Sequence, residues 1–105
     1  HKNKNILNIE KNNENNSLKK IEIILKKLSN KGIKINLFIL PTLEDLNKKK
    51  KFKHFLENIS ISNVKIINLY NDINNQNYED LYFNNAHLNE KGHDYLSKLL
   101  YKIVG

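Results

Sequence analysis

The chain has 105 residues, a length that suits one domain or part of one. All 18 basic residues are lysine, the formal net charge is +7, and the lack of cysteine excludes a disulfide framework, a thiol nucleophile and a zinc site with cysteine ligands. Arginine, which favours base readout and bidentate phosphate binding, is absent as well, so no nucleic-acid partner is expected despite the charge.

The N-terminal part of the chain predicts a polar segment followed by one helix. Residues 1–16 are rich in lysine and asparagine and are expected to be flexible or, around Ile6–Ile9, to form an edge strand. Ser17 is a candidate N-cap for the helix, and Gly32 is expected to end it. The apolar residues at helical spacing are Leu18, Ile21, Ile24, Leu25 and Leu28. The chain therefore divides into an N-terminal segment, 1–16, and a domain part, 17–105.

Two short apolar segments predict strands that are buried on both faces, as in a parallel sheet. They span Ile33–Leu40, which ends before Pro41, and Val64–Leu69. Between them, Thr42 is expected to cap a helix that runs to about Asn58 and presents its lysines to solvent. Strand, helix and strand in this order predict a parallel pair with a right-handed crossover.

The remaining sequence predicts a long loop and a closing helix. Tyr70–Ala86 is polar, and a structureless loop of this length is usually functional or mobile. Asn89 precedes an apolar helix face formed by Leu96, Leu99, Leu100, Ile103 and Val104. Ligands of open parallel sheets bind beyond the carboxyl ends of the strands. His87, at the end of the loop, is therefore expected on the side of the sheet where chemistry occurs.

The segment Tyr82–His93, which reads YFNNAHLNEKGH, resembles the last sequence block of the SGNH (GDSL-like) hydrolases. In that block an Asp-x-x-His pair is followed by Leu/Pro-Asn-x-x-Gly and a terminal helix. The resemblance covers the chain from about Ile33 onward and implies part of a three-layer α/β/α fold of the flavodoxin-like type, with a parallel sheet. It also implies a serine esterase or O-acyltransferase that acts on an acyl ester or an acylated carbohydrate and needs no cofactor or metal.

The resemblance assigns roles to particular residues. The histidine that matches His87 deprotonates a serine, and the residue three positions earlier fixes the imidazole tautomer. That earlier position holds Asn84, an amide that orients an imidazole without supplying charge, and Asp80 in the same loop is the alternative acid. The nucleophile block and both oxyanion blocks of the family are absent from the sequence. The serine is therefore expected upstream of His1, with a missing N-terminal half or a partner chain completing the sheet.

Several residues also have plain structural interpretations. His87 is alternatively a loop histidine that bonds a backbone carbonyl at a helix start. His93 is expected to be a packing or surface residue, because its spacing from His87 does not suit two zinc ligands on one helix face. Asn89 is expected to cap the last helix. Gly92, which has no side chain, is expected to let the first turn of that helix approach the site closely.

Three functions follow from these features. The first is an ester hydrolase or O-acyltransferase, and the second is a degenerate, non-catalytic relative that binds a glycan or a partner protein, motivated by Asn84. The third is a basic binder of nucleic acid or an anionic surface, motivated by the net charge and the cluster Lys48–Lys53. The block also resembles the membrane-associated branch of the superfamily, which implies the cell envelope or the extracellular space. No apolar run approaches the roughly 18 residues of a membrane span.

Overall fold

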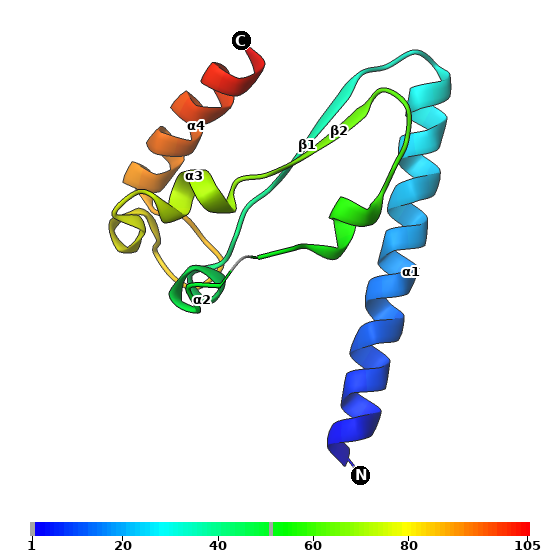
Figure 1. Ribbon diagram of the computed structural model, residues 1–105, viewed down its shortest axis with the longest axis horizontal. Coiled ribbons are helices and arrows are strands. Elements are labelled where there is room, and N and C mark those ends of the chain that lie inside the picture. The colour runs from blue at the N-terminus through cyan, green and yellow to red at the C-terminus, as the bar shows by residue number, and fades with distance from the viewer. Residues whose placement is uncertain (1, 51) are drawn as a thin grey trace. The chain divides into compact units, whose positions relative to one another are not determined.

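The computed structural model describes residues 2–50 and 52–105, with side chains described from Asn15 onward. Within this part, the chain is a mixed α/β structure with one parallel sheet of two strands (Figure 1). In chain order, the elements, with 3-10 helices labelled η, are α1 (Lys2–Asn30), β1 (Ile35–Ile39), α2 (Leu43–Asn47), η1 (Phe55–Asn58), β2 (Val64–Asn68), α3 (Tyr70–Asn74), η2 (Tyr78–Leu81) and α4 (Glu90–Val104).

The chain forms two compact units. The first consists of the chain up to Phe38 together with Lys53–Ile67, and it contains α1, η1 and most of both strands. The second consists of Ile39–Phe52 and Asn68–Gly105, and it contains α2, α3, η2, α4 and the last residue of each strand. All candidate site residues belong to the second unit.

α1 is longer than predicted at its start and ends as predicted. Ser17 lies inside the helix, and residues 2–16 are helical rather than flexible or an edge strand, while His1 lies outside the described residues. Neither Gly nor Pro occurs before Gly32, so the sequence contains no strong helix breaker upstream of Ser17. Gly32 has a φ of 78°, and the amides of Gly32 and Ile33 donate to carbonyl oxygens three and five residues earlier, at 2.9 and 3.2 Å. This is a Schellman motif.

β1 and β2 are parallel because they pair start with start and end with end. The amide of Ile35 donates to the carbonyl oxygen of Asn63 at 2.8 Å. At the other end, the amide of Leu69 donates to the carbonyl oxygen of Ile39 at 3.0 Å. The predicted parallel pair is therefore confirmed.

The prediction that both strands are buried on two faces is wrong. The second residue of each strand, Asn36 in β1 and Lys65 in β2, is exposed, whereas the other strand residues are buried or half-buried. In residues 2–50 and 52–105 the sheet has two strands. No second layer covers these two polar positions within that part of the chain.

α2 begins as predicted but is much shorter. Thr42 caps it in a reciprocal capping box with Asp45, the two hydrogen bonds measuring 3.0 and 3.1 Å. The helix ends at Asn47 rather than near Asn58, and Lys49 has a φ of 55°. The lysine run that follows carries no apolar side chain, so a longer helix would have no face to bury, and burial supplies most helix stability in proteins. The described lysines of this run therefore lie in a turn rather than along a helix.

The stretch predicted as a structureless loop, Tyr70–Ala86, is largely folded. It contains α3 and η2, and an isolated antiparallel bridge joins Tyr82 to Leu88 beyond it. Its apolar side chains contribute to the core of the second unit. The buried ones are Tyr70, Ile73, Tyr78, Leu81 and Tyr82. The signal was the i, i+3 spacing in each short helix, which is too brief to register as a helical period.

α4 confirms the predicted closing helix. Asn89 is its N-cap, and the Asn89 Oδ1 accepts from the amide of Gly92 at 2.8 Å. The leucines of its apolar face are half-buried, whereas Ile103 and Val104 are exposed. Across residues 2–50 and 52–105, no helix combines the length and the apolar character needed to cross a bilayer.

Candidate functional site

His87 lies in a short hairpin-like loop between η2 and α4, the histidine loop, residues 82–89. Tyr82 and Leu88 form the base of this loop through an antiparallel bridge, and both are buried. The amide of Phe83 donates to the carbonyl oxygen of His87 at 2.8 Å, and residues 83–87 are exposed. The loop is therefore held at its base by packing and presents its histidine to solvent.

Asn84 and His87, which the resemblance to the SGNH hydrolases pairs, are in contact. The Oδ1 atom of Asn84 lies 2.8 Å from Nδ1 of His87. The same oxygen accepts from the backbone amides of Ala86 and His87, at 3.1 and 3.0 Å. Because backbone amides only donate, the oxygen of Asn84, not its nitrogen, faces the ring. In a neutral ring, this contact favours the tautomer with the proton on Nδ1 and the lone pair on Nε2.

Asn85 fastens the tip of the histidine loop to the start of α2. Its Oδ1 accepts from the amide of Glu44 at 2.7 Å, and its carbonyl oxygen accepts from the amide of Leu43 at 2.9 Å. The first amides of a helix have no partner within the helix, so Asn85 satisfies two of them. Sequence reasoning missed this residue, because one asparagine beside another carries no signal of a contact 41 residues away.

Tyr82 ties the base of the loop to the segment that follows β1. Its ring is buried, and its hydroxyl donates to the carbonyl oxygen of Pro41. Burial and, to a lesser extent, the negative charge of Asp45 raise the pKa of Tyr82 to about 12. The hydroxyl therefore stays protonated and keeps this hydrogen bond at neutral pH. Pro41 lies two residues beyond the end of β1, so the loop is attached near the carboxyl end of that strand.

Asp80, the alternative acid, makes no contact with His87 in the described part of the chain. Its carboxylate accepts from Nδ2 of Asn77 at 2.7 Å and lies 4.0 Å from Nζ of Lys91. Its carbonyl oxygen accepts from Nδ2 of Asn89 at 2.7 Å. Asp80 therefore supports the start of α4, and the structure does not bring it to the imidazole.

Gly92 allows the first turn of α4 to lie close against η2. A Cβ atom at this position would be 2.0 Å from the carbonyl oxygen of Leu81 and 3.0 Å from Cβ of Leu88. The amide of Asn89 donates to the same Leu81 oxygen at 2.9 Å. Asn89 and Gly92 are thus structural, as predicted, and they fix the path by which the chain leaves the histidine loop.

In the described residues, the imidazole of His87 is paired with the side-chain amide of Asn84. His93 is exposed on α4, and no serine in the described chain hydrogen-bonds to His87. Within the described residues, no group of three or more histidine or acidic side chains gathers in a way that could hold a metal ion. Comparisons of the chain with protein-family models, with curated proteins and with solved structures give no match.

Proposed function

We propose that the chain is the C-terminal part of an SGNH-type ester hydrolase or O-acyltransferase in which His87 is the general base. The observation that carries this proposal is the 2.8 Å contact between Asn84 Oδ1 and His87 Nδ1 in an exposed, anchored loop. This contact leaves Nε2 as the basic atom and fixes the ring at two points, its backbone and its Nδ1. In the proposal, the serine nucleophile lies upstream of His1.

The proposed mechanism is acyl transfer through serine. Nε2 of His87 takes the proton of the serine hydroxyl as that oxygen attacks the ester carbonyl, and it then gives the proton to the departing alkoxide. The acyl group passes from serine to water in a hydrolase, or to a sugar hydroxyl in an acyltransferase. Donors from the upstream segment stabilise the oxyanion of the tetrahedral intermediate.

Asn84 orients the imidazole but does not stabilise the positive charge that forms on it. In serine triads, replacing the aspartate by asparagine lowers kcat about 10⁴-fold. We therefore expect slow turnover for the native sequence and a gain of activity for Asn84→Asp. The carboxylate of that variant can still accept hydrogen bonds from the backbone amides of Ala86 and His87. Those amides only donate, so the exchange of amide for carboxylate leaves both bonds in place.

The substrate proposed is an acyl ester or an acylated carbohydrate. Phe83 directly precedes Asn84 and is 78% exposed, so an aromatic ring is available beside the base. Such a ring favours contact with an acyl chain or with the apolar face of a sugar. The two-stranded parallel sheet supports a partial α/β fold, and in the proposal an N-terminal half or a partner chain completes the three layers.

A non-catalytic relative that binds a glycan or a protein is the second candidate. The neutral amide at the acid position favours it, because a binding protein needs no charge behind the imidazole. Its loop is expected to be as well ordered as that of an enzyme, since the anchors Asn85 and Tyr82 serve either role.

The test is ester hydrolysis by the protein in its natural length. Activity on 4-nitrophenyl acetate is measured for the wild type, His87→Ala and Asn84→Asp, with His93→Ala as the matched control, because His93 is an exposed histidine outside the loop. The enzyme proposal expects loss of activity in His87→Ala, no change in His93→Ala and a large gain of kcat in Asn84→Asp. If all four proteins hydrolyse the ester at the same rate, His87 is not the base. If Asn84→Asp gains nothing and the wild type is inactive, the binding protein is favoured.

A further inference from the structure

Two isoleucines of α1 lie in solvent although the helix has a buried face. The buried and half-buried stripe consists of Leu18, Ile21, Leu25 and Leu28. Ile23 and Ile24, in contrast, are 54% and 57% exposed. These two side chains therefore contribute little to the core of the first unit, and their exposure calls for a different explanation.

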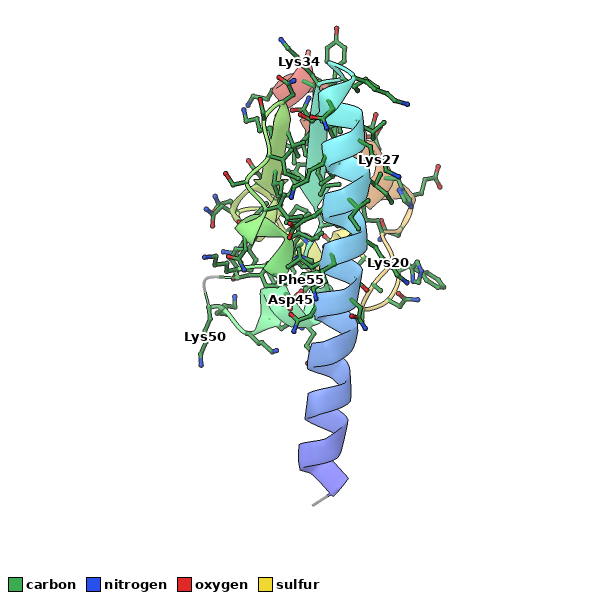
Figure 2. All side chains as sticks on the ribbon, turned by 90° about the vertical axis from the view of Figure 1, so that its right-hand side faces the viewer. Lys20, Lys27, Lys34, Asp45, Lys50 and Phe55 are labelled. Carbon is green, nitrogen blue, oxygen red and sulfur yellow. The ribbon has the colours of Figure 1, made fainter. Side chains whose placement is uncertain are left out.

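Lysines share this exposed side of α1 with the two isoleucines. At about 100° per residue, Lys20 and Lys27 fall between Ile23 and Ile24 on the helix surface, and all four lie within an arc of about 100°. Figure 2 shows Lys20 and Lys27 on the same side of the helix. Lys31 follows in the turn after the helix and is exposed as well. We call these five residues the outer face of α1.

Among the side chains of α1 described from Asn15 onward, none that is acidic lies on the outer face. Among the described side chains of α1, Glu22 is the acidic one, and it is half-buried on the opposite side of the helix. None of the ion pairs found in residues 15–50 and 52–105 involves a lysine of the outer face. A partner that complements the outer face would therefore be anionic.

The isoleucines distinguish between two anionic partners, a lipid bilayer and a nucleic acid. On a bilayer, branched apolar side chains enter the boundary between headgroups and acyl chains, while lysine stems extend so that their ammonium groups stay among the phosphates. On a nucleic acid, the two isoleucines would remain in water between the phosphate contacts. The chain also lacks arginine, the residue best suited to bidentate phosphate recognition.

We propose that the outer face of α1 binds the surface of an anionic lipid bilayer, with Ile23 and Ile24 inserted among the headgroups. The helix lies along the surface and does not cross it. This binding belongs to the first unit and is independent of the histidine loop, so it stands whether or not the protein is an esterase.

Vesicle sedimentation of the full chain tests the proposal. The protein is mixed with vesicles of phosphatidylcholine alone or of phosphatidylcholine with phosphatidylserine, and the bound fraction is measured. We expect binding to the phosphatidylserine vesicles, at least about a tenfold weaker partition for Lys20→Glu/Lys27→Glu, and weaker binding for Ile23→Ser/Ile24→Ser. Because these residues are exposed, circular dichroism is expected to show an unchanged fold.

The matched control is Lys65→Glu/Lys102→Glu, which changes the net charge equally at two exposed lysines off the outer face. If this control weakens binding as much as Lys20→Glu/Lys27→Glu, only net charge matters and the proposal fails. It also fails if the protein does not bind the phosphatidylserine vesicles. Binding to duplex DNA is measured as well. The proposal also fails if Ile23→Ser/Ile24→Ser binds the vesicles like the wild type while Lys20→Glu/Lys27→Glu no longer binds either the vesicles or duplex DNA, since the face then binds any polyanion.

Discussion

The second unit contains two exposed polar segments that are held in different ways, the lysine turn at residues 48–50 and the histidine loop. In the lysine turn, the Nζ atom of Lys48 lies 4.0 Å from Glu44 Oε1, and the Nζ atom of Lys49 lies 5.8 Å from the centre of the Tyr78 ring. In the histidine loop, the side-chain hydrogen bonds of Asn84 and Asn85 measure 2.7–3.1 Å. The two segments are equally polar, but the histidine loop is held by short hydrogen bonds and the lysine turn is not.

The difference comes from the length of the side chains. The amides of Asn84 and Asn85 sit close to the backbone and accept from amides that would otherwise face water. A lysine carries its charge on a long stem, where solvent screens an exposed pair and the contribution to stability is small. Short amide side chains therefore fix the conformation of a loop. In a lysine run, the conformation is fixed by the flanking residues instead.

The largest expected effect on stability is at Gly92, where α4 packs against η2 at the end of the histidine loop. Gly92→Ala places a Cβ 2.0 Å from the carbonyl oxygen of Leu81, so η2 and α4 must separate. We expect a loss of about 3 kcal/mol in the free energy of unfolding, measured with urea. Gly32→Ala is the control, because its Cβ meets no atom within 4 Å and only the positive φ costs about 1 kcal/mol. Equal losses in the two variants would refute the close packing at Gly92.

The second prediction concerns the anchor at Tyr82 and its dependence on pH. Tyr82→Phe removes the hydrogen bond to Pro41 and is expected to cost about 1 kcal/mol at neutral pH. The pKa of Tyr82 rises from 10.0 in the unfolded chain to about 12 in the fold, so the unfolded state loses its proton first. Its contribution to stability is therefore complete below pH 10 and is lost as the pH rises through 12. The stability difference between Tyr82→Phe and wild type should shrink over this window; a constant difference would contradict the assignment.

The third prediction concerns the tautomer of His87. Asn84→Ala removes the acceptor at Nδ1 and two turn hydrogen bonds, with an expected loss below about 1 kcal/mol because the site is exposed. Nitrogen-15 NMR of the neutral imidazole should find the proton on Nδ1 in the wild type and a shift toward Nε2 in Asn84→Ala. Asn84→Asp should keep the wild-type tautomer. A wild-type ring with its proton on Nε2 would contradict the hydrogen bond from His87 Nδ1 to Asn84.

The smallest effect is expected in the lysine turn. Lys50→Ala should change the free energy of unfolding by less than about 0.5 kcal/mol, since an exposed side chain without a packed partner is replaced. Thermal melts at low and high salt measure it. A large loss would show that the lysine turn is as firmly held as the histidine loop.

The sequence predicts the local parts of this structure well. Thr42, Asn89 and Gly32 act on amides or carbonyls within a few residues, so a cap or a stop can be identified without knowledge of the fold. The Asn84–His87 pair is local for the same reason. Ser17 shows the limit: a good cap residue does not start a helix when the preceding residues can also be helical.

The non-local parts escape sequence reasoning. The contacts Asn85–Glu44 and Tyr82–Pro41 each join residues 41 positions apart, and they depend on how α2 and the histidine loop pack in the second unit. Polar Tyr70–Ala86 predicts a loop because α3 and η2 are too short to show a period. Whether Asp80 reaches His87 is equally undecidable from one sequence, since it depends on the direction that the chain takes after η2, to which Asp80 belongs.

The attachment of Asn85 to α2 has a consequence for insertions and deletions. Because one asparagine satisfies the amides of both Leu43 and Glu44, a change of even one residue in the length of the histidine loop would move the donors and acceptors out of register. The lysine turn has no such cross-connection through its backbone and should tolerate added residues. In related sequences, insertions and deletions are thus expected in the turn after α2 and not within residues 82–89.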